Sequence, residues 1–344
     1  MVGRMPPLPS ARGETTAFLL DALRRPPHAL GRATSRPGGD DPLSDDDLQL
    51  ALYLCYELHY RGLDGVDDRW EWEPSLLAFR AELEAIFEAA LEGVVPRAAG
   101  EALPAPEEMD IALRAIAEAD DGPSLSRHLE QAGTREHVLE FCVHRSAYQL
   151  KEADPHSWAL PRLGGAPKAA LVEIQADEYG GGRPERIHAD LFARTLRALG
   201  LDDAYGAYLD RIPGVTLATV NLMSLAGLHR RRRGAIVGHL ALFEMTSSVP
   251  NRRYANALRR LGFGDDATAF FDEHVVADAV HENIAAVDLA GGLVRQQPEL
   301  CADVLWGARG LVALEARWAT HLLGAWEAGR SSLRAPLQEP AAVA

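Results

Sequence analysis

The chain has 344 residues and a mass of 37.4 kDa, enough for one large domain or for one domain with an added N-terminal section. Its composition, 47% apolar and 25% charged, excludes a collagen-like, coiled-coil or largely disordered chain. The formal net charge of −15 argues against nucleic-acid binding, because phosphate recognition needs a basic surface. Ala, Leu, Glu and Arg abound while strand-forming runs are sparse, so we expect an all-α protein.

The two ends of the chain are poor in helical pattern. Residues 1–44 are rich in proline and contain one short helical candidate, over 14–25. Such a segment buries too little apolar surface to offset its ordering entropy, so we expect a flexible Pro/Gly-rich arm there. A disordered tail is expected over 331–344.

Between the arm and the core, the pattern predicts an N-terminal helical extension over 45–104. Its first helix, over 45–61, carries an apolar stripe that begins at Leu48 and Leu52. Its second helix is predicted over 74–95. A proline-rich break then separates the extension from the rest of the chain.

The core, residues 105–330, is a succession of amphipathic segments separated by Pro, Gly and Asn. Long helices joined by short loops are typical of a bundle. The predicted helices span 107–119, 124–132, 134–153, 168–179, 184–199, 214–230, 233–246, 251–261, 265–288 and 298–327.

Cysteines and hydropathy indicate the compartment. Cys55, Cys142 and Cys301 are too far apart for a disulfide framework or a metal motif. We expect them to be buried thiols in a reducing cytoplasm. No segment approaches the roughly 20 apolar residues of a membrane span, and no secretory signal is recognisable, so we expect neither membrane nor secreted location.

The helix predicted over 265–288 carries the most informative pattern. At 100° per residue, His274, Asp278 and His281 lie within about 60° of one another around the helix axis. Two imidazoles and a carboxylate suit Fe, Mn or Zn, and they are costly to bury without a partner. The alternative is a solvated polar face.

Carboxylates on other predicted helices favour the metal hypothesis, because a di-metal bundle site needs inward-facing glutamates from several helices. Glu244 lies in an apolar run where a lone carboxylate would be expensive to bury. Glu178 ends one helix, and His188 lies one turn into the next. Glu152 closes the helix over 134–153. Taken singly, Glu152 and Glu178 are also compatible with surface charges.

In this order along the chain, these residues resemble the heme-oxygenase-like diiron oxidases, the iron-containing redox enzyme family. The resemblance rests on His274-x-x-x-Asp278-x-x-His281, on Glu244 upstream, and on Glu178 with His188 ten residues later. It covers about 134–326, and not the N-terminal extension. It implies a heme-oxygenase-like helical bundle that binds two irons, uses O2 as co-substrate and oxidises a small molecule.

The resemblance assigns seven metal ligands. They are Glu152, Glu178, His188, Glu244, His274, Asp278 and His281. Glu140 competes with Glu152 for the first-helix position, but the two are twelve residues apart and so point about 120° away from each other. We favour Glu152, because its separation from Glu178 fits the family better.

The resemblance also implies a reaction. O2 activation by the two irons would pass through a peroxo-diferric intermediate and act on an amino-acid-like or fatty-acid-like substrate. The resemblance is also compatible with a homodimer and with an external electron donor.

Two other classes of protein compete with this interpretation. A heme-oxygenase-fold protein without two irons would need a proximal heme ligand, for which His137 or His144 are candidates, or a hydrolytic nucleophile, for which Cys142 is the candidate. A non-enzymatic helical binding protein would use its charges only for solvation. Further charged candidates are Glu57, His59, His156, Glu173 and His229.

Overall fold

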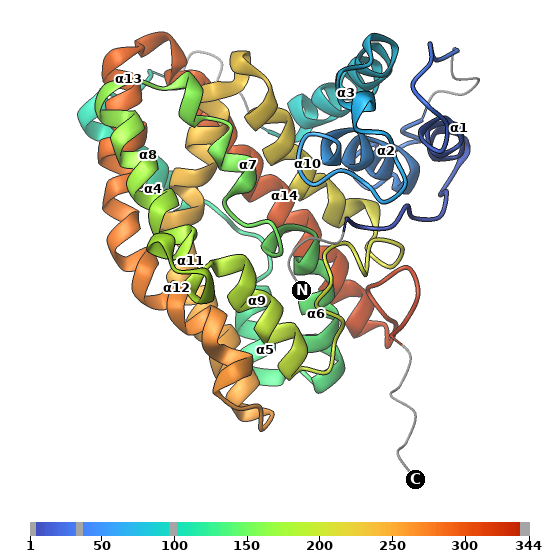
Figure 1. The fold of residues 1–344 in the computed structure, drawn as a ribbon. Coiled ribbons are helices and arrows are strands. Elements are labelled where there is room, and N and C mark those ends of the chain that lie inside the picture. Colours follow the sequence, from blue (N-terminus) through green and yellow to red (C-terminus); the bar gives the residue numbers. More distant parts are fainter. Residues whose placement is uncertain (1–4, 32–36, 96–101, 338–344) are drawn as a thin grey trace.

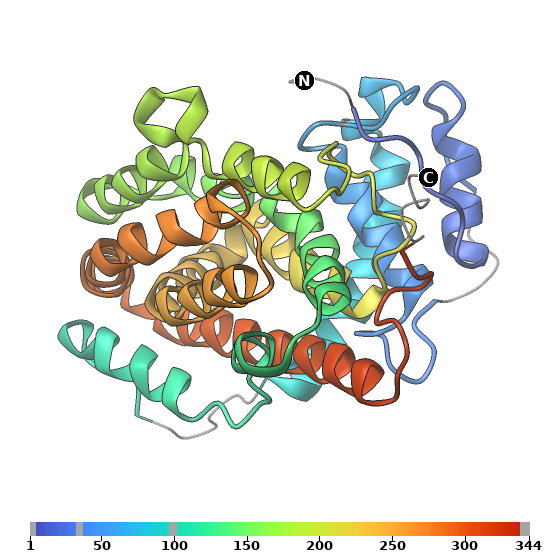
Figure 2. The same cartoon turned by 90° about the horizontal axis from the view of Figure 1, so that it is seen from below.

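The computed structural model describes residues 5–31, 37–95 and 102–337, without the side chains of 278 and 279. Within these ranges all regular structure is helical (Figure 1). The interior of the core is α11 (Arg233–Arg260), which packs along α12 (Asp265–Asn283) and α14 (Cys301–Glu327). Seen from below, α11 in gold lies between α12 in orange and α14 in red (Figure 2).

The remaining core helices complete the bundle around α11. They are α4 (Met109–Glu118), α5 (Leu125–Ala132), α6 (Arg135–Gln149), α7 (Asp154–Ser157), α8 (Gly165–Glu178), α9 (His188–Ala198), α10 (Gly214–Leu228) and α13 (Gly292–Gln296). Helix α12 continues into a π-helical segment, η7 (Ile284–Gly291), which packs on α8. Short 3-10 turns lie at Asp68–Trp72, Pro106–Glu108, Leu160–Arg162, Gly180–Gly182, Pro184–Arg186, Arg230–Arg232 and Pro298–Leu300.

Two glycines bring α11 and α14 into backbone contact. A Cβ added at Gly238 of α11 would lie 1.8 Å from the Val304 carbonyl oxygen, and one at Gly307 of α14 would lie 2.0 Å from that of Ala235. Real Cβ atoms do not approach a backbone oxygen so closely. The glycines therefore determine the spacing of the two helices, and α11 carries Glu244.

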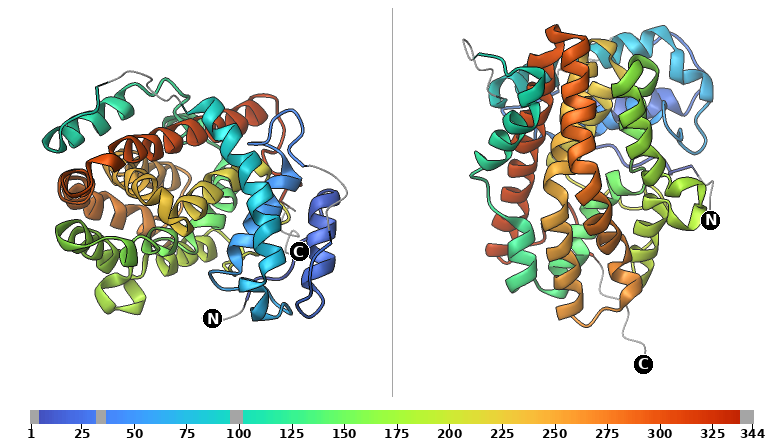
Figure 3. Two further views of the ribbon diagram at one scale, coloured as in Figure 1. Left: turned by 90° about the horizontal axis from the view of Figure 1, so that it is seen from above. Right: turned by 90° about the vertical axis from the view of Figure 1, so that its left-hand side faces the viewer.

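The N-terminal extension forms a separate group of helices on one side of the bundle, drawn in blue and cyan (Figure 3). It consists of α2 (Asp46–Glu57) and α3 (Pro74–Val94), and α1 (Glu14–Leu23), from the segment expected to be an arm, packs on α2. Helix α2 packs against α10 of the core. A buried ion pair also crosses the boundary, with Lys151 Nζ 3.0 Å from Glu57 Oε2.

The structure differs from the sequence predictions at both ends of the chain. Within the expected arm, α1 packs on α2 and buries Leu19, Leu20 and Leu23. Within the expected tail, Ser332 and Leu333 are buried, and only the part over 338–344 lies outside the described residues. Both segments find apolar surface on neighbouring helices, which local composition does not reveal.

Two predicted helix boundaries also differ from those in the structure. The break predicted between 246 and 251 is absent, because α11 runs through Pro250. Proline removes one helical hydrogen bond, but buried residues on both sides of it, Leu242 and Ala255 among them, keep the helix packed. The helix predicted over 134–153 ends instead at Gln149 and continues as turns. The three cysteines are buried free thiols, as expected.

Candidate metal centre

Six of the seven predicted ligands meet in the interior of the bundle, and none of the six is more than 6% exposed. They come from several elements: Glu152 from the turn after α6, Glu178 from the end of α8, His188 from the start of α9, Glu244 from α11, and His274 and His281 from α12. The seventh, Asp278, belongs to α12, but its side chain lies outside the described residues.

The turn between α8 and α9 depends on Gly180. Its φ is +71°, and a Cβ there would lie 2.8 Å from the backbone of Arg186 and Ile187. Glycine alone adopts this conformation freely and leaves room for the approaching backbone. The close approach brings the end of α8 to the start of α9, and thereby Glu178 to His188.

The residue after Glu152 has an unusual backbone. Ala153 has a φ of +75°, the only positive φ among the described residues other than glycine. Such a conformation costs of order 1 kcal/mol for alanine and persists where the surroundings enforce it. Here it turns the chain sharply between α6 and α7, with Glu152 at the turn.

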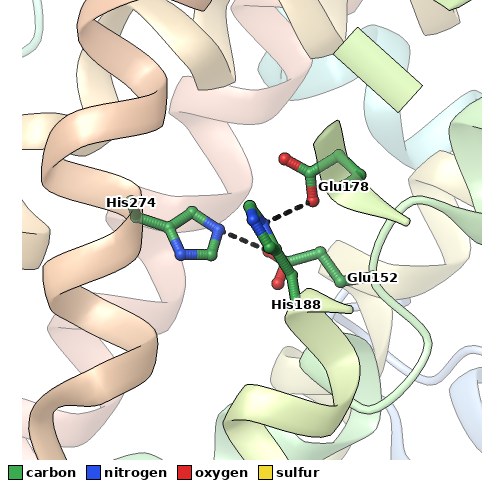
Figure 4. Close-up of side chains that lie close together, drawn as sticks. All are labelled: Glu152, Glu178, His188 and His274. Atoms are coloured by element: carbon green, nitrogen blue, oxygen red, sulfur yellow. Dashed lines mark ion pairs between the residues drawn. The ribbon is translucent and has the colours of Figure 1, made fainter. Parts of the chain in front are cut away.

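The first cluster contains Glu152, Glu178, His188 and His274 (Figure 4). One ligand atom from each lies within 4.8 Å of those of the other three. His274 Nε2 is 3.6 Å from Glu152 Oε1. His274 Nδ1 donates to the Phe270 carbonyl at 2.8 Å, which leaves Nε2 as the nitrogen with a lone pair in the neutral ring.

The second cluster contains Glu178, Glu244 and His281, again with ligand atoms within 4.8 Å of one another. His281 Nδ1 donates to Glu244 at 3.3 Å, and its Nε2 donates to Asp177 at 3.0 Å. Glu178 belongs to both clusters. A carboxylate shared in this way is the geometry in which one glutamate can contact two metal ions.

Several buried atoms at the site have no hydrogen-bond partner. They are Glu152 Oε2, Glu178 Oε2 and His188 Nδ1. His188 Nδ1 and Glu178 Oε2 lie 2.9 Å apart as an ion pair without hydrogen-bond geometry. Leaving a buried polar atom without a hydrogen bond costs about 1–3 kcal/mol. Carboxylate oxygens and imidazole nitrogens are iron ligands, so the residues present fit an iron site.

The local electrostatics also suit a cation. Burial raises the pKa of Glu178 to about 7, and burial raises the pKa of Glu152. Burial and the neighbouring His274 lower the pKa of His188 to about 4. A bound cation compensates the buried carboxylates, and the neutral imidazole is the form that binds metal.

Glu140 lies apart from these clusters. Its carboxylate accepts hydrogen bonds from Trp326, from Ser331 and from both the amide and the hydroxyl of Ser332. These hydrogen bonds hold the C-terminal segment against α6. Of the two first-helix carboxylates, it is Glu152 that the structure brings to the other candidate ligands.

The other charged candidates pair elsewhere. His229 contacts Glu84, His59 contacts Glu71, and Glu57 contacts Lys151. His156 hydrogen-bonds His239 at 3.1 Å, and it lines a small space beside Glu152 and Glu178. The contacts of His229 and Glu57 connect the N-terminal extension to the core, that of His59 lies within the extension, and that of His156 fills the interior beside the site.

The residues that the two competing hypotheses require have other contacts, or are buried and unreactive, in the structure. His144 is buried, and both of its nitrogens contact hydroxyls, those of Thr216 at 2.7 Å and Ser332 at 3.0 Å. His137 stacks on Trp326, with ring centroids 4.4 Å apart. Burial raises the pKa of the Cys142 thiol far above its usual range, which suppresses its reactivity.

A cavity of about 300 Å³ adjoins the first cluster, and Glu152 and His274 form part of its wall. Arg145 and Glu315 also line it and form a two-point ion pair at 2.9 and 2.7 Å. Gln149 lines it as well, and its Oε1 has no hydrogen-bond partner. Much of the remaining wall is apolar, with Leu242, Phe243, Leu311, Val312 and Trp318.

Sequence reasoning missed the cavity residues and the contact between Asp177 and His281. A signal exists for the former: Arg145, Gln149 and Glu152 follow one another at spacings of four and three residues, which would place them along one face of the helix predicted over 134–153. Glu315 comes from α14 and has no comparable signal. Asp177 is an exposed acid beside Glu178, and nothing in the local sequence distinguishes it from its neighbours.

Comparison with known proteins agrees with the fold. Residues 139–316 match the profile of the iron-containing redox enzymes, so the chain belongs to this family, and the predicted family and all-α heme-oxygenase-like fold are confirmed. The chain is also similar to the nitrosourea synthase of Streptomyces achromogenes subsp. streptozoticus, with 30% identity over 146 residues. That match covers 42% of this chain and 31% of the synthase, so the chain spans about a third of that enzyme. Among the described residues, no helix is long and apolar enough to cross a membrane.

Proposed function

We propose that the protein is a non-heme diiron oxidase or oxygenase that uses O2 to oxidise a small molecule. The observation that carries this proposal is the position of Glu178 in both buried clusters. Glu152, His188 and His274 would complete one iron position, and Glu244 and His281 would complete the other, with Asp278 as a further ligand. When bound, the two irons supply the redox chemistry that activates O2.

The protein's own residues determine where that chemistry acts. Glu152 and His274 belong both to the first cluster and to the cavity wall, so a substrate in the cavity lies beside this iron position. The Phe270 carbonyl orients His274. Phe243 and Leu242 contribute apolar wall that excludes water from the reacting groups.

The cavity supports a substrate with an apolar body and a polar group. A volume of about 300 Å³ is at the small end of the range for ligand sites. Both amino-acid-like and fatty-acid-like molecules fall within this description. Nitrosourea formation is the activity of the relative; for this chain we propose O2-dependent oxidation, with an external electron donor where the substrate does not supply the electrons.

Anaerobic reconstitution with Fe(II) tests the proposal. After desalting, we expect about two irons per chain and O2 consumption in the presence of a substrate from a panel of amino acids and fatty acids. The His281→Ala variant should lose two-iron loading and O2 consumption. The matched control is His229→Ala, which removes a histidine that contacts Glu84 instead. Wild-type protein that retains no iron, or that binds heme, contradicts the proposal.

A further inference from the structure

The two histidines on α12 are held by different kinds of group. His274 Nδ1 donates to a backbone carbonyl of its own helix, that of Phe270, at 2.8 Å. His281 Nε2 donates to a side chain from another helix, Asp177 of α8, at 3.0 Å. The His281 side chain is fully buried, whereas that of Asp177 is 62% exposed. A surface carboxylate therefore reaches a buried candidate ligand.

The contact determines which nitrogen of His281 faces the second cluster. With Nε2 directed to Asp177, Nδ1 faces Glu244 at 3.3 Å, the carboxylate that shares the second cluster with Glu178. A carboxylate behind a metal-binding histidine fixes the orientation and tautomer of its ring and increases its basicity. Among the described side chains, Asp177 is the hydrogen-bond partner of this outer edge of the ring.

We propose that Asp177 is a positioning residue for the second metal position: it holds His281 so that Nδ1 is presented to the metal shared with Glu178 and Glu244. The inference rests on the diiron function proposed above. It predicts an asymmetry between the two positions. The first position should not depend on Asp177, because His188 and His274 do not contact it and His274 is held by backbone.

The contribution of Asp177 is distinguishable from that of a general acidic surface. Glu173 is another exposed acid on α8, one turn before Asp177. Loss of negative charge near the site would affect metal binding about equally in the Asp177→Ala and Glu173→Ala variants. A positioning role affects only the former.

Anaerobic titration with Co²⁺, followed by its visible absorption, and with Fe²⁺, followed by retained metal, tests the inference. We expect wild-type protein and Glu173→Ala to bind two ions. Asp177→Ala should bind the first ion normally and the second about 10- to 100-fold more weakly. Asp177→Asn, whose amide oxygen can still accept from Nε2, should recover much of this loss.

Two results would overturn the inference: normal binding of both ions by Asp177→Ala, or equal weakening of both. Thermal unfolding of the variants in the presence of a chelator serves as the check on folding. If Asp177→Ala does not fold, Asp177→Leu provides the test, because leucine is similar in size to aspartate and cannot accept a hydrogen bond from Nε2. Wild-type protein that binds no second ion would instead reject the proposed diiron function, so the two failures are distinguishable.

Discussion

The carboxylate of Glu178 lies 2.9 Å from Nδ1 of His188, although the two residues belong to different helices with three successive glycines between them. Gly180 makes this approach possible, because its left-handed backbone passes within contact distance of Arg186 and Ile187. The ligand geometry at this point is thus determined by a backbone contact outside the ligands themselves.

The first prediction concerns this turn. Gly180→Ala should reduce retained iron and destabilise the fold by roughly 2 kcal/mol or more, because the added Cβ meets backbone and the φ is unfavourable. Gly181→Ala is the matched control, because its φ is +58° and its Cβ would meet nothing within 4 Å. We therefore expect this variant to lose only the cost of a positive φ in alanine, about 1 kcal/mol of stability. For each variant, urea unfolding measures the stability and iron quantification measures the retained metal. Equal effects of the two substitutions would show that the close approach is unimportant.

A second prediction concerns the contact between α11 and α14. Gly238→Ala should destabilise the protein by about 3 kcal/mol or more, since its Cβ would overlap the Val304 carbonyl oxygen. Gly324→Ala, in an open position on α14, should instead stabilise by about 0.5–1 kcal/mol. Thermal unfolding distinguishes them. A Gly238→Ala variant as stable as the wild type would refute the packing argument.

The third prediction concerns pH. Burial lowers the pKa of His281, but the hydrogen bonds to Glu244 and Asp177 and the charges of Glu244 and Glu178 outweigh it and raise the pKa to about 9. Between pH 6.5 and 9 the folded chain therefore holds a proton that the unfolded chain has lost, and stability falls as pH rises. With a chelator present, we expect a loss of about 2–3 kcal/mol over this range.

Urea unfolding at pH 6.5 and pH 9 measures this loss. In the His281→Gln variant the dependence should be mostly abolished, because glutamine does not titrate. Below pH 6.5 the raised pKa of Glu178 and the lowered pKa of His188 act in opposite directions, so a flatter profile is expected there. A wild-type profile that rises toward pH 9 contradicts the arrangement around His281.

A fourth prediction concerns the cavity. Val312 is a half-buried wall residue on α14, so Val312→Phe should fill part of the space and reduce substrate-dependent O2 consumption about tenfold or more. Iron content should stay unchanged, because Val312 is not one of the candidate ligands. Val312→Ala enlarges the same space and should keep most of the activity on a small substrate. Full activity of Val312→Phe would place the substrate elsewhere.

Part of this architecture is readable from local sequence. Helical periodicity predicts most core helices, and the spacing of His274, Asp278 and His281 places them on one face, because an α-helix repeats every 3.6 residues. The predictions fail where tertiary contacts outweigh local signals. Helix α11 continues through Pro250 because both of its ends are packed, and α1 is ordered by the leucines that it buries against α2.

The sequence by itself determined the helical class, the family and the types of residue available as ligands, because these depend on composition and on spacing within single helices. Only the tertiary structure decided that Glu152 and not Glu140 lies with the others, that Glu178 belongs to two clusters, and that Asp177 reaches His281. These relationships join residues up to 122 positions apart, as Glu152 and His274 are. They depend on how the helices pack, which no local pattern encodes.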